Sequence, residues 1–151
     1  MSHSSTDDLS MHLPDGRRLG YVELGDADGL PLIFFHGTPG SRKMFDADEL
    51  MARIPGLRLI LPERPGYGLS DPQPDRTLLD WPQDVAALAD QLGLDRFAVG
   101  GISGGGPHAL ACAHRQSDRL THTIVLASPA PACFPGATRG MAFGNRLAMH
   151  L

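Results

Sequence analysis

The chain has 151 residues, which is enough for one domain and too few for two. Its hydrophobic fraction of 42% and charged fraction of 20% are typical of a globular protein. The 18 glycines and 13 prolines are spread along the chain, which favours tight turns over a disordered tract. The net charge is -4 and the basic residues form no cluster, which argues against nucleic acid as a partner.

The termini and the cysteines bear on the compartment. No apolar run approaches the length of a membrane span, so no membrane partner is expected. Residues 1–8 are polar and lack the basic and apolar regions of a secretory signal; they read as a disordered N-terminus. Cys112 and Cys133 are not at metal-ligand spacing, and we expect a cytoplasmic protein with reduced thiols.

The first half of the chain predicts a hairpin and two core strands. Apolar stretches within residues 9–25 flank Pro14-Asp15-Gly16, the pattern of a β-hairpin. Residues 31–35 form an apolar run bounded by turn formers, which predicts a buried strand. A weakly patterned helix is expected over residues 41–54, and a second core strand over residues 57–61.

The second half predicts alternating helices and strands. A helix is expected over residues 80–92, with Asp80 as its cap, Pro82 in the first turn and Gly93 after its end. A strand is expected over residues 97–102, a helix over residues 104–116 and a further core strand over residues 121–127. A last helix is expected to begin near Thr138 and is unfinished at residue 151.

This alternation indicates an α/β fold with a mostly parallel sheet covered on both faces. In that architecture, functional sites form where the carboxyl ends of the strands meet. Two loops, residues 36–40 and residues 101–105, are predicted to lie at such ends.

The sharpest local signal is Gly101-Ile102-Ser103-Gly104-Gly105, which matches the G-x-S-x-G nucleophile elbow. Such an elbow turns a strand at once into a helix and holds the serine at the tip in a strained conformation, while glycines remove side chains that would collide. The N-terminus of the helix then favours negative charge beside Ser103. The alternative is a plain glycine-rich turn, with phosphate bound at the helix N-terminus.

Two further motifs accompany the elbow. His36-Gly37-Thr38-Pro39-Gly40 follows the first buried strand, and Pro62-Glu63-Arg64-Pro65-Gly66-Tyr67-Gly68-Leu69-Ser70 follows the second. With them the chain resembles the α/β-hydrolase superfamily from about residue 10 onwards, within the group of serine hydrolases that carry an H-G-x-P-G loop. The second motif departs from the family pattern at Glu63, where Asp is usual.

The resemblance assigns roles to residues. It implies that Ser103 is the catalytic nucleophile and that Thr38 and Gly104 each donate a backbone N–H to an oxyanion hole. Residues 36–40 are called the oxyanion loop below. His36 is expected to shape this loop rather than to act as a base. The glycines expected to shape the loop and the elbow are Gly37, Gly40, Gly101 and Gly105.

The resemblance also implies the domain organisation. Residues 9–135 would form a partial α/β-hydrolase core, a three-layer sandwich truncated after about the sixth strand. Residues 136–151 would begin a helix of the cap region.

No catalytic acid or base is recognisable. His108 and His114 fall within the helix that leaves the elbow, His122 begins a strand, and His150 lies in the last predicted helix. Asp118 precedes that strand and lies at the wrong end of it. In the family order the acid and the base follow the serine, at positions that this chain does not show.

Three interpretations of function stay open. The first is a partial serine hydrolase for a small carboxylic ester or amide, inactive as a lone chain, and it implies no metal and no organic cofactor. The second is a half-enzyme completed in trans, by another polypeptide or a swapped homodimer, at the exposed edge of the sixth strand. The third is a non-catalytic binding protein that retains the pocket.

Overall fold

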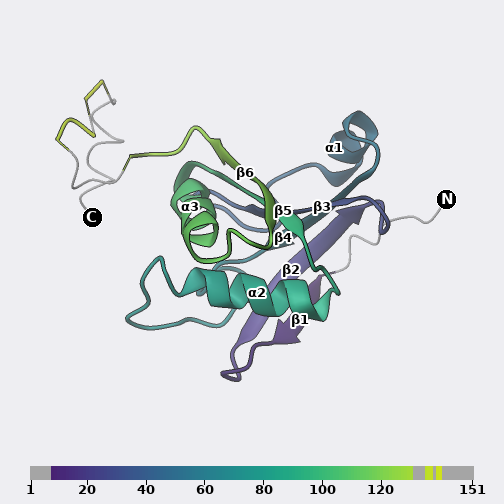
Figure 1. Ribbon diagram of the computed structural model, residues 1–151, viewed down its shortest axis with the longest axis horizontal. Helices are drawn as coiled ribbons and strands as arrows, with labels where there is room; N and C mark the ends of the chain where they lie inside the picture. Colours follow the sequence, from purple (N-terminus) through teal and green to yellow (C-terminus); the bar gives the residue numbers. More distant parts are fainter. Residues whose placement is uncertain (1–7, 131–134, 138, 141–151) are drawn as a thin grey trace.

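The computed structural model describes residues 8–130, 135–137, 139 and 140. Within this part of the chain a six-stranded sheet has the order β1-β2-β4-β3-β5-β6 (Figure 1). The strands are β1 (Leu9–His12), β2 (Arg18–Gly25), β3 (Leu30–Phe35), β4 (Leu57–Pro62), β5 (Phe97–Ile102) and β6 (Leu120–Leu126). The helices are α1 (Ala47–Arg53), α2 (Trp81–Gln91), a 3-10 turn (Ser103–Gly105) and α3 (Gly106–Arg115).

The sheet is antiparallel at one side and parallel in the rest. β1 pairs with β2, and β2 with β4, in antiparallel register, which confirms the predicted hairpin. β4, β3, β5 and β6 are parallel neighbours. The predicted mostly parallel α/β sheet is therefore present, and the carboxyl ends of β4, β3 and β5 lie next to one another.

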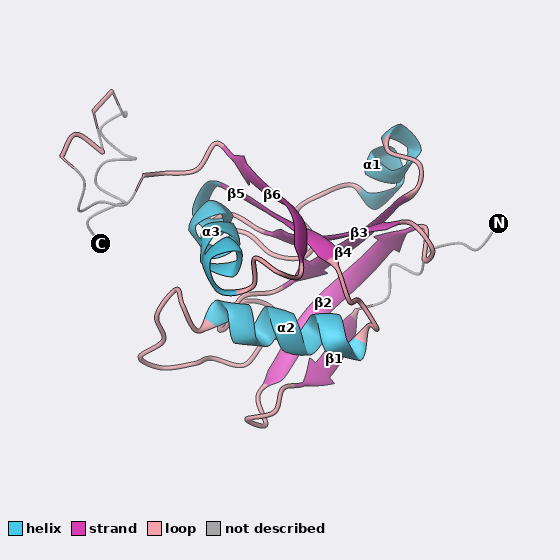
Figure 2. Ribbon diagram, in the orientation of Figure 1, coloured by secondary structure: helices cyan, strands magenta, loops and turns pink. Residues whose placement is uncertain are grey.

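Both faces of the sheet are covered, because successive side chains of each strand point to opposite faces. On one face, Ile33 and Phe35 pack in a core with residues of α2 and α3, which lie in front of the strands (Figure 2). On the other face, Phe34 packs in a second core with Leu50 of α1. The arrangement is the predicted three-layer sandwich.

The helix predicted over residues 41–54 is shorter than expected. α1 begins only after Asp46, whose carboxylate accepts a hydrogen bond from Glu49 N at 3.0 Å. The backbone N–H groups of Arg42 and Lys43 are turned to other acceptors, the carboxylate of Glu63 and the hydroxyl of Ser41. Residues 41–45 therefore belong to the loop between β3 and α1 and not to the helix.

Asp80 does not cap α2, which corrects the second helix prediction. Its carboxylate accepts hydrogen bonds from the backbone N and the hydroxyl of Thr77, at 2.6 and 2.9 Å, and so closes the turn before the helix. Pro82 does lie in the first turn, and Gly93 follows the end of α2 with a φ of 68°.

The two outer strands differ. β1 has four residues, of which two are exposed, whereas β6 has seven and is exposed at six of them. The apolar side chains of Ile124, Val125 and Leu126 are 37%, 40% and 46% exposed. In the described part of the chain, β6 pairs only with β5. Such an edge offers unpaired backbone groups to another strand.

Most of the predicted cap-region segment, including residues 141–151, lies outside the described residues, as do residues 1–7. Asp8, the first described residue, forms ion pairs with Arg42 and Lys43. No described helix combines the length and the apolar character needed to cross a membrane.

Candidate active site

Ser103 lies at the tip of a sharp bend between β5 and α3. Ile102 is still extended, with φ -109° and ψ 141°, whereas Ser103 has a φ of 51°, and the 3-10 turn that it begins leads directly into α3. A non-glycine residue in the left-handed region carries backbone strain that the surrounding structure must support. The Ser103 side chain is exposed at this tip.

Two glycines allow the bend. A Cβ on Gly101 would overlap the carbonyl oxygen of Gly105, and a Cβ on Gly105 would overlap the carbonyl oxygen of Phe35. In both cases the obstacle is backbone, which cannot turn aside as a side chain can. Glycine at positions 101 and 105 is therefore required by the close packing of β5 and α3 against the end of β3.

The oxyanion loop faces Ser103. A Cβ on Gly37 would lie 3.3 Å from Ser103 Cβ and 3.8 Å from its Oγ, and a Cβ on Gly104 would lie 3.2 Å from Thr38 N. Gly40 closes the loop on itself, since its Cβ would lie 2.7 Å from the carbonyl oxygen of Gly37. The structure thus brings Ser103, Gly37, Thr38 and Gly104 together, as the sequence predicted.

His36 is buried and uses both ring nitrogens. Its Nδ1 lies 2.9 Å from the carbonyl oxygen of Gly37, and its Nε2 accepts a hydrogen bond from Arg64 N at 3.2 Å. This pairing requires the neutral tautomer with the proton on Nδ1. Burial lowers the pKa of His36, which keeps the ring neutral. These contacts support a role in shaping the loop.

Arg64 also holds the oxyanion loop, through its guanidinium group. Its Nη2 donates to the carbonyl oxygen of Gly37 at 2.9 Å and to Thr38 Oγ1 at 2.7 Å. The guanidinium lies over the ring of Tyr67, 4.7 Å from its centroid, and burial lowers the pKa of Arg64. The motif after β4 contained Arg64, but its contact with Thr38 depends on the pairing of β3 with β4.

Among the candidate histidines, His108 contacts the elbow itself, at Gly104. Its Nδ1 donates to the carbonyl oxygen of Gly104 at 3.1 Å, its Nε2 lies 3.5 Å from Arg76 Nη1, and its ring meets the edge of Trp81. Burial lowers the pKa of His108 to about 4. The imidazole therefore packs beneath the elbow instead of facing the Ser103 hydroxyl.

Among the described candidates, His114, His122 and Asp118 form no hydrogen bond with Ser103 either. His114, His122 and Asp118 are exposed, and His150 lies outside the described residues. Across residues 8–130 no hydrogen bond to the Ser103 hydroxyl is present, although the hydroxyl of Ser128 donates to the Ser103 carbonyl oxygen at 3.1 Å. The described site therefore has a strained serine beside Gly37, with Thr38 N close to Gly104, and no base hydrogen-bonded to the hydroxyl among the described residues.

Comparison with known proteins agrees with this geometry. The family model described as the alpha/beta hydrolase fold matches residues 31–147. The chain belongs to the α/β-hydrolase family. It is 33% identical to a non-heme chloroperoxidase of Streptomyces lividans, over 78% of this chain and 43% of that protein. It is 31% identical to a proline iminopeptidase of Xylella fastidiosa, over 74% of this chain and 36% of that protein.

A solved structure gives the same result. The crystal structure of a hypothetical protein from Pseudomonas aeruginosa matches with a TM-score of 0.73 and 26% identity, over 87% of this chain and 47% of that one. The matched part of the chain thus covers less than half the length of each of these relatives, and the chain is partial with respect to them. It corresponds to the N-terminal part of α/β-hydrolase structures.

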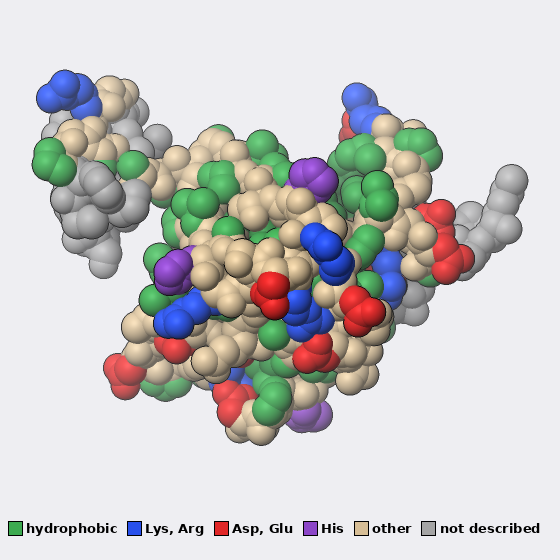
Figure 3. All heavy atoms as spheres, in the orientation of Figure 1, with side chains coloured by type: hydrophobic (Ala, Val, Ile, Leu, Met, Phe, Trp, Pro, Cys, Tyr) green, Lys and Arg blue, Asp and Glu red, His purple; other side chains and the backbone are tan. Residues whose placement is uncertain are grey.

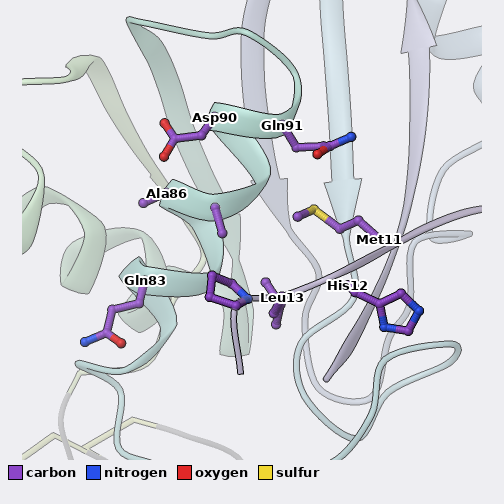
Figure 4. Close-up of a pocket in the computed structure, with 9 residues that line it drawn as sticks. Met11, His12, Leu13, Gln83, Ala86, Asp90 and Gln91 are labelled. Atoms are coloured by element: carbon purple, nitrogen blue, oxygen red, sulfur yellow. The ribbon is translucent and has the colours of Figure 1, made fainter. Parts of the chain in front are cut away.

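A groove of about 660 Å³ lies elsewhere on this α/β-hydrolase, between β1 and α2 (Figure 4). Met11, His12 and Leu13 line one side, and Gln83, Ala86 and Asp90 line the other. None of its lining residues belongs to the elbow or the oxyanion loop. Among the described residues, no group of three or more His, Cys, Asp or Glu side chains is placed to hold a metal ion.

The surface over α2 has mixed charge. Figure 3 shows acidic and basic side chains side by side on this face. Ion pairs such as Arg119–Asp90, at 2.8 Å, account for part of the pattern.

Proposed function

We propose that this α/β-hydrolase domain carries the nucleophile and the oxyanion hole of a serine hydrolase that cleaves acyl bonds. The observation that carries the proposal is the position of Ser103, with a φ of 51°, against Gly37, while the next residue, Gly104, lies against Thr38. A plain glycine-rich turn would not require an exposed hydroxyl in a strained conformation at this point. The phosphate-binding alternative has no such requirement.

In the proposed reaction Ser103 Oγ attacks the carbonyl carbon of a small carboxylic ester or amide. The carbonyl oxygen becomes an oxyanion that accepts hydrogen bonds from the N–H groups of Thr38 and Gly104. The leaving alcohol or amine departs with a proton, which leaves an acyl group on Ser103. Water then releases the acid. No metal or organic cofactor takes part.

The serine itself favours acyl transfer over other reactions of the fold. A carboxylate at this position would attack carbon and form an ester, as in epoxide hydrolysis and dehalogenation. The relatives carry names as different as chloroperoxidase and proline iminopeptidase, so family membership leaves the substrate open. A buried free thiol at Cys112 is compatible with the proposed cytoplasmic compartment.

The general base must come from outside residues 8–130. Serine needs an adjacent base to be an effective nucleophile, and His36 and His108 have their ring nitrogens engaged. In a well-studied serine protease, loss of the base reduces turnover by about a millionfold. We therefore expect residues 8–130 alone to hydrolyse nothing at a measurable rate.

A second candidate is an enzyme completed in trans at β6. The open edge and the exposed Ile124, Val125 and Leu126 favour it, because a further strand could pair there. The partner would be the C-terminal half of a family member or a second copy of this chain. Co-expression with such a half should give a complex and ester hydrolysis. Absence of both would count against this candidate.

The test of the main proposal is covalent labelling with a fluorophosphonate probe. The chain is assayed alone and together with the C-terminal half of a relative, and the labelled peptide is identified by mass spectrometry. Label is expected on Ser103, at a much higher rate in the presence of the complementing half. Ser103→Ala should abolish it, whereas Ser128→Ala, which changes a neighbouring serine after β6, should not.

Two outcomes would contradict the proposal. Labelling that persists in Ser103→Ala would place the nucleophile elsewhere. A folded complex that hydrolyses esters without labelling Ser103 would do the same. A folded complex with neither activity nor label would favour the non-catalytic binding protein.

A further inference from the structure

Glu63, the residue at which the chain departs from the family pattern, is fully buried at the end of β4. Its Oε1 accepts hydrogen bonds from Arg42 Nη1 at 2.7 Å and, more weakly, from Arg42 N at 3.4 Å. Its Oε2 accepts one from Leu69 N at 2.6 Å. Hydrogen bonds to a carboxylate are strong in a buried site. The carboxylate therefore holds the segment into which the oxyanion loop returns, because Arg42 comes two residues after Gly40.

Arg64, the next residue, holds the opposite end of the same loop. Its backbone N–H donates to His36, where the loop begins, and its guanidinium donates to Gly37 and Thr38. The two contacts are possible because β3 and β4 are parallel neighbours, so that their carboxyl ends lie together. Glu63 and Arg64, which follow β4, thus hold both ends of the oxyanion loop, which follows β3.

We propose that Glu63 and Arg64 are positioning residues, a clamp that fixes the oxyanion loop with Thr38 N–H opposite Gly104. Glu63 acts through Arg42, and Arg64 acts through His36 and Thr38. The effect of the clamp on turnover rests on the proposed hydrolase function. Its effect on the order of the loop does not.

The glycines around Glu63 show that this longer acid is built into the site. A Cβ on Gly68 would overlap the Glu63 carboxyl group, and a Cβ on Gly20 would lie 3.0 Å from Oε2. Gly66, in the same turn, would meet nothing within 4 Å. Both Gly66 and Gly68 have positive φ, of 83° and 51°, so alanine is strained at either position. Only Gly68→Ala also displaces the carboxylate, which makes Gly66→Ala its matched control.

The first experiment measures amide hydrogen exchange by NMR in the 151-residue chain and in Glu63→Gln. We expect the amides of Arg42, Leu69 and Arg64 to exchange at least about tenfold faster, since a buried bond to a charge is lost. The Arg64 amide is decisive, because it bonds to His36 and not to the replaced side chain. The amide of Val99 in β5 should keep its protection. Glu49→Gln, which removes an exposed ion pair with Arg53, is the control.

A uniform loss of protection at Arg64 and Val99 would show that Glu63 only stabilises the whole fold, and would overturn the proposal. Unchanged exchange at Arg64 would overturn it as well.

The second experiment covers the case in which Glu63→Gln does not fold. Gly68→Ala should release the Arg64 amide, whereas Gly66→Ala should leave it protected. Adding Glu63→Asp to Gly68→Ala shortens the acid and should restore most of the protection. Equal effects of the two alanine variants, or no rescue by Glu63→Asp, would contradict a clamp that acts through this carboxylate.

The functional part is tested in the complemented protein, by the rate of fluorophosphonate labelling. Arg64→Lys keeps the charge, but its nitrogen is one bond closer to the backbone than Nη2, the single nitrogen that donates to Gly37 and Thr38. We expect Arg64→Lys and Glu63→Gln to slow labelling of Ser103 by roughly tenfold to a hundredfold, since removal of one oxyanion donor costs more than misplacing it. If the parent protein is never labelled, the proposed function fails, while the exchange measurements still decide the clamp.

Discussion

The two sides of β5 differ in how completely they are built. On the β3 side, its carboxyl end lies against a loop whose polar groups are held by His36 and Arg64. On the β6 side, it borders a strand that is exposed along nearly its whole length. The same strand thus separates a closely packed half-site from an open edge. The contacts that hold the oxyanion loop come from residues before β6, whereas in the described part of the chain the outer edge of β6 is unpaired.

The largest expected effect contrasts Gly105 with Gly106. A Cβ on Gly105 would meet the backbone of Phe35 and His36, on the closed side, whereas a Cβ on Gly106 would meet side chains of Ser128 and Val125, on the open side. Gly105→Ala should lower the free energy of unfolding by about 3 kcal/mol or more, because backbone cannot yield. Gly106→Ala should cost less, about 1 to 2 kcal/mol, because the obstacle is Ser128 Oγ and Cβ, so that the segment after β6 must shift and not a core strand, and because alanine favours a helix. Chemical denaturation of both variants measures the difference, and equal losses would remove the distinction between the two sides.

A second prediction concerns His108 and the pH dependence of the free energy of unfolding. His108 has a pKa of about 4 in the folded chain, so below its ordinary value of 6.5 the unfolded chain binds the proton more readily. The free energy of unfolding should therefore fall between about pH 6.5 and 4, by roughly 3 kcal/mol at pH 4 from this group.

The measurement compares the parent chain with His108→Gln across this pH range. The variant should lose this part of the slope, whereas His114→Gln, on the exposed side of α3, serves as the control. A parallel pH dependence of parent and His108→Gln would show that the buried imidazole does not destabilise the folded chain in acid.

The smallest expected change in stability concerns the open edge. Leu126→Lys places a charge on β6, where the leucine is 46% exposed, and should change the free energy of unfolding by less than about 0.5 kcal/mol. It should nevertheless shift the chain from oligomers towards monomer in light scattering, since charged edges resist strand pairing. Leu110→Lys, at a leucine of α3 that is 54% exposed, is the control. An equal shift by both variants would mean that exposed leucine in general, and not the strand edge, drives association.

The elements that depend on local pattern were predictable. The apolar runs 31–35, 57–61, 97–102 and 121–127 became β3, β4, β5 and β6 within a residue at each end. The turn at Ser103 was predictable because glycine at 101 and 105 is a local requirement. The catalytic roles of Ser103, Thr38 and Gly104 stay predictions.

Contacts between strand ends were not predictable in the same way. The order β4-β3-β5 cannot be derived from the periodicity of a single chain, so the hydrogen bond from Arg64 to Thr38 could not be predicted. For the same reason the expected helix over residues 41–54 began too early, since Arg42 N–H bonds to a distant carboxylate. The sequence pattern predicts helices and strands one at a time. The hydrogen-bond partners of buried polar groups depend on how these elements are arranged in space.

The buried guanidinium beneath the oxyanion loop has an electrostatic consequence. Arg64 Nη2 lies 2.7 Å from Thr38 Oγ1, so a cationic group is located directly under the peptide that precedes Pro39. In a region with little water its field is weakly screened, and it raises the potential at the neighbouring N–H. An anion above Thr38 would therefore be attracted through space as well as by its hydrogen bond.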